Sequence, residues 1–251
     1  MLAFIGYDKQ TFNEFFTSLQ TVCHNDPLQD YISEDVSDHS DGWGFIDSDI
    51  NFVNFSKYSD PIYKCEIPEM RGRFRLVHAR NASKGQPSGF IKSHPYHGAT
   101  TKYDIFLMHN GLVDKVKIKH NLSLGSIENM TDSEVMLDLM CTYVDATDEL
   151  MLREALNEVY SRNALISGLN IFLFSINRKT MEHDLLIYSD ALKFNEYHRF
   201  YYSKGKNWQC VYSSSILRSE HFPKTSENIP LDSRTIYGVG PEGPVALFHL
   251  E

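Results

Sequence analysis

The stretch LVHARNASKGQPSGFIKSHPYHGATTKYDIFLMHNGLV, residues 76–113, decides how the rest of the chain is interpreted. It contains two apolar runs typical of strands. The first ends in HAR (78–80), where Arg80 could hold a carboxylate through two parallel hydrogen bonds. The second ends in HNG (109–111), whose side-chain amide and backbone N–H groups could stabilise a negatively charged oxygen. The stretch therefore predicts a binding site for a substrate carboxylate and an oxyanion site.

Each of these motifs also has an ordinary structural interpretation. An isolated HNG is most often a turn, because asparagine and glycine tolerate positive φ. An arginine at the end of a strand is usually a solvated surface residue. A catalytic role is therefore favoured only because the motifs occur together and in a fixed order.

The ordered motifs resemble the glutaminase domain of class II glutamine amidotransferases, which are N-terminal nucleophile hydrolases. The DGWG motif resembles the variant found in the small stand-alone members of the family. The resemblance continues more weakly through YSSS near the end of the chain. In chain order, the matching segments are DGWG (41–44), HARNASKG (78–85), SHPY (93–96), HNG (109–111), TDSE (131–134) and YSSS (212–215).

The resemblance implies a binding or catalytic role for five residues of this chain. Arg80 would bind the α-carboxylate of glutamine, and Asp132 would bind its α-ammonium group. Ser83 and Gly111 would add polar contacts. Asn110 and Gly111 would form the oxyanion hole. Substituting Arg80 or Asp132 by alanine would then weaken glutamine binding, with little change in thermal stability because neither is expected in the apolar core.

Other matching residues would serve as structural support. His78 and His94 would be hydrogen-bonded scaffold residues at strand ends, and Asp41 and Trp43 would be the supporting residues of the DGWG motif. For Asp132 an alternative stays open, in which it is merely an acidic residue in the first turn of a helix, favoured by the helix dipole.

In this family the nucleophile is the thiol of an N-terminal cysteine, and its own α-amino group, with a pKa of about 8, accepts the proton. Attack on the side-chain amide of glutamine gives a γ-glutamyl thioester and ammonia, and water or an acceptor then resolves the thioester. The resemblance thus implies glutamine or a γ-glutamyl small molecule as substrate and no cofactor. A separate ammonia-using synthase is a candidate partner.

The chain departs from the family at its first residues. The family usually begins with Met-Cys-Arg followed by an apolar strand, whereas here Met1 is followed by Leu2. The run MLAFIG (1–6) aligns with the strand after Cys-Arg, so we expect the nucleophile just upstream of Met1 and an inactive chain as numbered. Two alternatives stay open: a catalytically inactive glutaminase-like binding or scaffold protein, and a γ-glutamyl peptide hydrolase.

Hydrophobic periodicity predicts a mixed α+β fold. Residues 1–7 are typical of a buried strand, and residues 9–22 have the spacing of an amphipathic helix. Thr131 and Glu134 have the separation of a capping box, which predicts a helix over residues 131–143. The remaining predicted elements are a helix at 150–160 and strands at 51–58, 72–78, 169–176, 184–188, 198–202, 209–212, 235–239 and 245–248.

The resemblance supplies the specific architecture, a four-layer αββα sandwich of two antiparallel sheets in a single domain spanning residues 1–251. The run KVKIK (115–119) alternates like an edge strand, where lysines discourage aggregation. We interpret it as a solvated face.

The composition limits the kinds of partner that the protein is expected to bind. A formal charge of −9 and the lack of a polybasic cluster argue against nucleic acid. No apolar run reaches the length of a membrane span and no signal peptide is recognisable, so we expect a cytoplasmic protein that does not bind membranes.

Metal and disulfide chemistry are not expected either. The four cysteines are scattered, without a Cys-x-x-Cys pair, and are interpreted as free thiols. Four histidines near the motifs have no spacing that favours a metal site. The residues concerned are Cys23, Cys65, Cys141 and Cys210, and His39, His94, His97 and His109.

Overall fold

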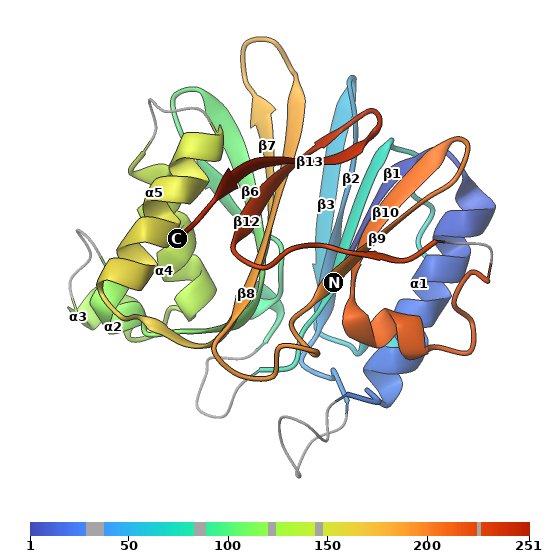
Figure 1. Cartoon of the computed structure of the whole chain (residues 1–251), viewed down its shortest axis with the longest axis horizontal. Coiled ribbons are helices and arrows are strands. Elements are labelled where there is room, and N and C mark those ends of the chain that lie inside the picture. Colours follow the sequence, from blue (N-terminus) through green and yellow to red (C-terminus); the bar gives the residue numbers. More distant parts are fainter. Residues whose placement is uncertain (29–37, 83–88, 120–123, 144–147, 225–226) are drawn as a thin grey trace. The chain divides into compact units, whose positions relative to one another are not determined.

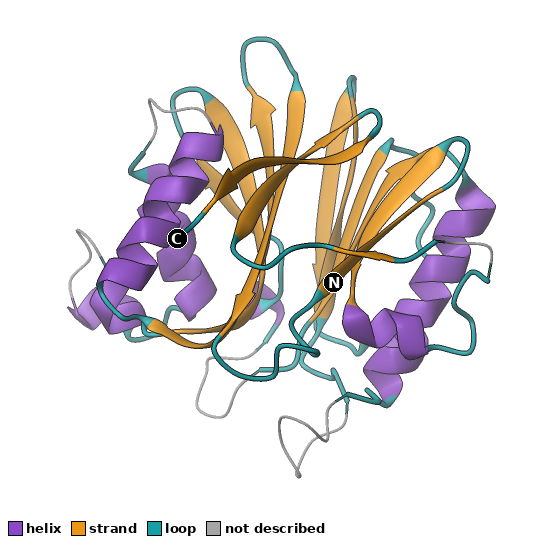
Figure 2. Cartoon of the chain, viewed as in Figure 1, coloured by secondary structure: helices purple, strands orange, loops and turns teal. Residues whose placement is uncertain are grey.

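The computed structural model describes residues 1–28, 38–82, 89–119, 124–143, 148–224 and 227–251 (Figure 1). These residues form two compact units. The first contains the described parts of Met1–Lys84, Ser88–Pro95 and Glu196–Leu231, and the second contains the described parts of Tyr96–Asn195 and Asp232–Glu251. Each unit has one antiparallel sheet with helices (Figure 2), which confirms the predicted α+β class with two antiparallel sheets. Their stacking as four layers, and a single domain, stay predictions.

The first unit is built on a seven-stranded sheet in the order β11-β9-β10-β1-β4-β2-β3, in which all paired strands are antiparallel. The strands are β1 (Leu2–Gly6), β2 (Trp43–Asp49), β3 (Phe52–Tyr58), β4 (Phe74–Ala79), β9 (Phe200–Lys204), β10 (Trp208–Ser213) and β11 (Ile229–Pro230). Short 3₁₀ helices lie at Ile62–Lys64, Phe90–Lys92 and Ser214–Arg218. The chain therefore begins in the middle of this sheet.

Helix α1 (Lys9–His24) lies along one face of this sheet (Figure 1). Asp8 caps its start by accepting a hydrogen bond from Thr11 N at 3.0 Å. The predicted aromatic face is buried, and Phe12 and Phe15 pack against Phe4 of β1 with ring centroids 5.6 and 6.3 Å apart. Leu2 and Phe4 thus face α1, so Met1 and Ala3 point to the other face of the sheet.

The second unit is built on a six-stranded antiparallel sheet in the order β13-β12-β8-β7-β6-β5. Helices α4 and α5 pack against each other and against this sheet (Figure 1). The strands are β5 (Tyr96–Ala99), β6 (Tyr103–Val113), β7 (Leu165–Asn177), β8 (His183–Ala191), β12 (Thr235–Gly240) and β13 (Gly243–His249). The helices are α2 (Lys115–Ile118), α3 (Leu124–Ile127), α4 (Asp132–Cys141) and α5 (Asp148–Ser161).

The predicted capping box at the start of α4 is confirmed. Thr131 Oγ1 accepts a hydrogen bond from Glu134 N at 3.1 Å, and Glu134 Oε2 accepts one from Thr131 N at 2.6 Å. Two otherwise unsatisfied backbone donors are paired in this way. The Thr131 hydroxyl also donates a hydrogen bond to the hydroxyl oxygen of Tyr96 at 3.1 Å, which ties the helix start to β5.

The edge strand predicted at residues 115–119 is wrong, because this run forms the one-turn helix α2. Asp114 Oδ1 accepts hydrogen bonds from Val116 N at 3.0 Å and Lys117 N at 3.4 Å, so a local cap outweighs the alternating pattern. Lys115 and Lys117 donate to backbone carbonyls of neighbouring segments, and Ile118 is buried. The lysines therefore anchor the helix end and do not guard a sheet edge.

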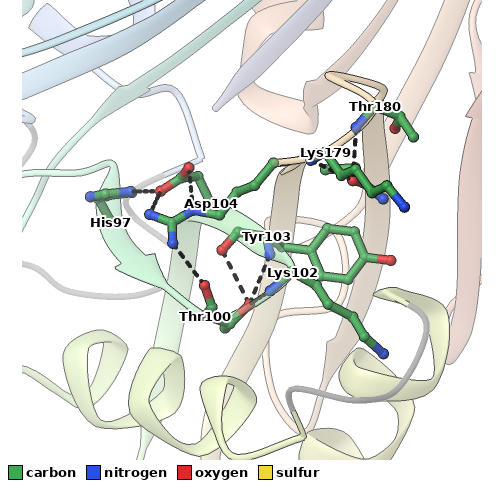
Figure 3. Close-up of polar contacts among 9 residues, drawn as sticks. His97, Thr100, Lys102, Tyr103, Asp104, Lys179 and Thr180 are labelled. Carbon is green, nitrogen blue, oxygen red and sulfur yellow. Dashed lines mark hydrogen bonds and ion pairs between the residues drawn. The ribbon is translucent and has the colours of Figure 1, made fainter.

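A polar cluster holds β5, β6 and the β7–β8 turn together at one end of the sheet (Figure 3). Asp104 Oδ2 accepts from Arg178 Nε at 3.0 Å, and Asp104 Oδ1 lies 3.0 Å from His97 Nε2. Arg178 also donates to the carbonyl of Thr100 at 3.0 Å. These side chains are partly exposed, so each ion pair contributes little stability. Together they help to fix the register of β6, which carries the HNG motif toward its other end.

No helix in the described part of the chain is long and apolar enough to cross a membrane.

Candidate active site

The glycines of the DGWG motif let the segment 93–95 lie directly on β2. At Gly42, where φ is +97°, a Cβ atom would be 2.4 Å from Ser93 Oγ. At Gly44 a Cβ atom would be 2.1 Å from the carbonyl oxygen of His94. Real Cβ atoms do not approach other atoms this closely, so both positions require glycine. The motif thereby sets the position of His94.

Asp41 fixes the path of the chain that follows β4. Its Oδ2 accepts a hydrogen bond from Ala82 N at 2.8 Å, and its N–H donates to the carbonyl of Arg80 at 3.2 Å. Arg80 N donates in turn to the carbonyl of Gly42 at 2.8 Å. Arg80 is only 6% exposed, so the interpretation of a solvated surface arginine is wrong. Its backbone is held from both sides where β4 ends.

The support residues of the first unit divide between the two faces of the sheet. His78 and His94 are buried with ring centroids 4.0 Å apart. Trp43 stacks on Tyr58 with centroids 4.5 Å apart and belongs to the core facing α1. Val77 and Ala79 belong to that core too, so His78 lies on the opposite face. Support roles for these residues remain predictions. Ser83 lies outside the described residues.

The start of the chain is buried in the middle of the first sheet. Met1 is 6% exposed, and its amino group donates a hydrogen bond to Ser213 Oγ at 3.0 Å. Ser213 N donates to the carbonyl of Met1 at 3.1 Å. Burial lowers the pKa of the amino group below its ordinary value of 8.0, opposed by weaker interactions with Cys23, Asp26 and Cys210.

This buried amine predicts that the 251-residue chain loses stability as the pH falls. The folded-state pKa is below the unfolded one, so the unfolded chain binds more protons between the two values and stability falls as pH drops through that window. We expect the melting temperature to rise as the pH increases toward about 8, relative to a chain extended by Met-Ala-Arg in front of Met1, which has no amine there. Thermal denaturation would test this, and parallel pH profiles would contradict it.

The HNG motif lies inside β6, not at its end, so the predicted strand end is wrong. Asn110 pairs with Asn170 and Gly111 with Leu169 on β7. The pairing resumes only at Val113 with Leu165, so β7 has two extra residues in a bulge at this point. The motif is therefore not a simple turn. Bulges of this kind redirect backbone groups and occur often beside active sites.

Gly111 is required by the close approach of this bulge. Its φ is +141°, and a Cβ atom there would lie 1.8 Å from the carbonyl oxygen of Gly168. Asn110 precedes it as a half-buried residue on the sheet face opposite the helices, because Leu107 and Val113 of β6 belong to the core packed on α4 and α5. The side chain of Asn110 makes no hydrogen bond to another described residue. It remains able to donate to a ligand.

Asp132 ties the start of α4 to the end of β6. It is 6% exposed, and its two oxygens accept hydrogen bonds at 3.0 Å, Oδ2 from Val113 N and Oδ1 from Ser133 N. His109 Nδ1 lies 3.0 Å from Ser133 Oγ, and burial lowers the pKa of His109 although Asp132 opposes this. Asp132 is thus more than an exposed first-turn acid acting on the helix dipole.

Both Arg80 and Asp132 are buried, so the reason given for expecting little change in stability on alanine substitution is wrong. For Asp132→Ala we expect a loss of about 2–4 kcal/mol of unfolding free energy, since two backbone N–H groups lose their acceptor. Chemical denaturation measures this. Asp138→Ala on the same helix is the control and should change stability by less than about 0.5 kcal/mol. Equal stabilities for the two variants would contradict the role given to Asp132.

The structure places the predicted site residues in two groups. Asp41, His78, Arg80 and His94 lie in the first unit around the ends of β2 and β4, and Asn110, Gly111 and Asp132 lie in the second unit around the end of β6. Ser213, which bonds the Met1 amino group, belongs to the weakly matching YSSS segment, whereas no motif points to the polar residue Asn170. The signal for Asn170 was a lone asparagine opening the apolar run NIFLFSI (170–176).

Among the described residues, no group of three or more histidine, cysteine, aspartate or glutamate side chains is placed to hold a metal ion. The four cysteines are free thiols, as predicted, but only Cys23 and Cys210 are fully buried, whereas Cys65 and Cys141 are partly buried. Burial raises the pKa of Cys23 to about 12 and that of Cys141 to about 11. Neither of these two thiols is thus set up as a thiolate nucleophile near neutral pH.

Comparison with known proteins finds similarity in structure only. No family model matches the chain, and no curated protein sequence matches it significantly. The structure is similar to the allosteric regulatory enzyme of purine biosynthesis, with a TM-score of 0.65 and 14% identity, and to glutamine phosphoribosylpyrophosphate amidotransferase from B. subtilis, with a TM-score of 0.65 and 12% identity. The match covers 98% of this chain and 48% of each of those chains, so the chain spans about half their length.

A glutamine aminotransferase class-II domain protein from Silicibacter pomeroyi is similar over 100% of this chain and 99% of its own, with a TM-score of 0.52 and 13% identity. At these identities the similarity bears on the fold. The predicted fold is thereby confirmed: the chain has the N-terminal nucleophile hydrolase fold of the class II glutamine amidotransferases.

Proposed function

We propose that this chain is the glutaminase part of a class II glutamine amidotransferase. It hydrolyses the side-chain amide of glutamine through a γ-glutamyl thioester on a cysteine joined in front of Met1, and it supplies ammonia to a synthase. The observation that supports this proposal is the register between β1 and β4, from which a cysteine two places before Met1 would be level with Arg80.

Leu2 lies opposite Val77, and each step back along β1 is one step forward along β4 because the strands are antiparallel. Met1 is then level with His78, and a residue two places before Met1 is level with Arg80. That residue also points to the same face as Met1, away from α1. The family's Met-Cys-Arg start, placed before Met1, puts its cysteine at this position.

Extension is compatible with the contacts at Met1. In a longer chain the Met1 nitrogen becomes an amide, which can still donate to Ser213 Oγ. The carbonyl of Met1 keeps its bond from Ser213 N. The extension also removes a buried ionisable amine, whose charged form is costly to desolvate. A cysteine placed there would have the free α-amine needed as its base.

Each proposed group has one task in the reaction. The thiol sulfur bonds to the amide carbon of glutamine while its proton passes to the α-amine, and Asn110 and Gly111 stabilise the negative oxygen of the tetrahedral intermediate. The C–N bond then breaks, and the protonated amine gives its proton to the leaving ammonia. Water cleaves the thioester to glutamate and regenerates the thiol. Arg80 and Asp132 hold the α-carboxylate and α-ammonium groups of glutamine.

The test compares three chains: the 251-residue chain, the same chain with Met-Cys-Arg in front of Met1, and a matched chain with Met-Ala-Arg. Intact mass confirms removal of the initiator methionine, and an enzymatic assay measures glutamate released from glutamine. We expect release only from the cysteine form. A folded, correctly processed cysteine form that releases no glutamate would overturn the proposal.

The same three chains separate the alternatives. Calorimetric binding of glutamine without turnover would favour a binding or scaffold protein. Release of glutamate from γ-glutamyl peptides, but not from glutamine, would favour a γ-glutamyl peptide hydrolase.

A further inference from the structure

Asn170 lies directly beside the proposed oxyanion residue. It pairs with Asn110 across β6 and β7, and with Ser189 across β7 and β8. Directly opposed residues point to the same sheet face, with Cβ atoms about 4.5–5.5 Å apart. Its strand neighbours Leu169 and Ile171 point the other way, into the core under α4 and α5. The three polar residues therefore form a row across the face opposite the helices.

The side chain of Asn170 is buried, but its polar atoms lack hydrogen-bond partners among the described residues. It is 0% exposed, and neither Nδ2 nor Oδ1 has a hydrogen-bond partner among the described residues. A buried amide without partners costs folding free energy, and an apolar residue of similar volume, such as leucine, would avoid that cost. Asn110 beside it is only half-buried, so the row reaches solvent on the β6 side. An amide in this position is suited to a ligand.

We propose that Asn170 is a specificity residue that recognises the side-chain carboxamide of glutamine. Its Nδ2 donates to the carbonyl oxygen and its Oδ1 accepts from the amide nitrogen, so the two amides pair. Glutamate has no N–H at that end and would place a carboxylate oxygen against Oδ1. The site would therefore bind the substrate more tightly than the product. This inference rests on the proposed glutaminase function.

The complementary amide explains why a polar residue is kept there. A site built to hydrogen-bond a substrate group rejects an analogue that lacks it, because the site's own buried groups are then left unpaired. Asn110 would act on the same carboxamide, as the donor to the oxygen that becomes negative. Asn170 would bond both the oxygen and the nitrogen of the carboxamide before the reaction begins. Its removal should therefore change substrate affinity and selectivity.

The test uses the Met-Ala-Arg form, which cannot turn glutamine over, with glutamine and glutamate titrated separately by calorimetry. In Asn170→Leu we expect glutamine affinity to fall at least about tenfold and the ratio of glutamine to glutamate affinity to approach one. The melting temperature should be unchanged or higher, because an unsatisfied amide is removed. A merely structural asparagine would give a lower melting temperature instead.

Ser175→Ala is the control, because Ser175 is buried on the same strand but on the helix side; it should leave both affinities unchanged. Asn170→Ala is the second variant. An unchanged affinity ratio in Asn170→Leu, or loss of folding in both Asn170 variants, would overturn this inference and leave the proposed function standing. If the parent protein binds neither ligand, the proposed function fails and this inference fails with it.

Discussion

In the form that carries Met-Cys-Arg, Asn110→Ala is expected to lower the turnover of glutamine by about 10²–10³ while changing its affinity much less. The reason is that the donor is needed mainly when the carbonyl oxygen becomes negative. The half-buried Asn110 amide makes no hydrogen bond to another described residue, so its removal should not disturb the fold. Steady-state kinetics of glutamate release give the two parameters separately.

Asn177→Ala is the matched control for this prediction. Asn177 ends β7 and uses its Oδ1 to accept hydrogen bonds from Lys179 N and Thr180 N in the turn to β8. It lies at the opposite end of β7 from the bulge, so turnover should be unchanged. Parent-like turnover in Asn110→Ala would remove the oxyanion assignment.

Gly111→Ala should destabilise the second unit at least as much as Asp132→Ala does. The added methyl group would lie 1.8 Å from the carbonyl oxygen of Gly168, and φ of +141° is unfavourable for every residue except glycine. Backbone strain of about 1–3 kcal/mol and overpacking of about 1–3 kcal/mol add to an expected loss of about 2–6 kcal/mol. Urea denaturation of the parent and the variant gives the difference.

Gly240→Ala is the comparison for that measurement. Gly240 ends β12 of the same sheet, and the nearest atom that a Cβ there would meet is the carbonyl oxygen of Gly243, at 3.7 Å. We expect its stability to stay close to that of the parent. If Gly111→Ala were equally well tolerated, the bulge between β6 and β7 would differ from the geometry described above.

The sequence predicted correctly those elements that depend on residues close together in the chain. The capping box of Thr131 and Glu134 begins α4, and the aromatic spacing of residues 9–22 becomes the buried face of α1. The DGWG motif also proved informative, since both of its glycines are needed for contact with residues 93–95. In each case the residues within one turn or one motif carry the information.

The errors concern interactions between distant segments. The HNG motif looks like the end of a strand, but pairing with β7 continues β6 to Val113. From the sequence, Arg80 and Asp132 are expected to be solvent-exposed, because charged side chains usually are. Tertiary packing nevertheless buries both. The KVKIK run forms a helix because the neighbouring Asp114 caps it, and the alternating lysines suggest a strand instead. Asn170 gains meaning only from lying opposite Asn110, which no local pattern reveals.

The measurement that tests the central claim most directly is the intact mass of the Met-Cys-Arg form, acid-quenched during turnover of glutamine, followed by peptide mapping. The account predicts a fraction of the protein heavier by one γ-glutamyl group, attached to the added cysteine and released by hydroxylamine. The Asn110→Ala variant should accumulate this species more slowly. Glutamate production with no such adduct, or an adduct on Cys23, Cys65, Cys141 or Cys210, would contradict the account.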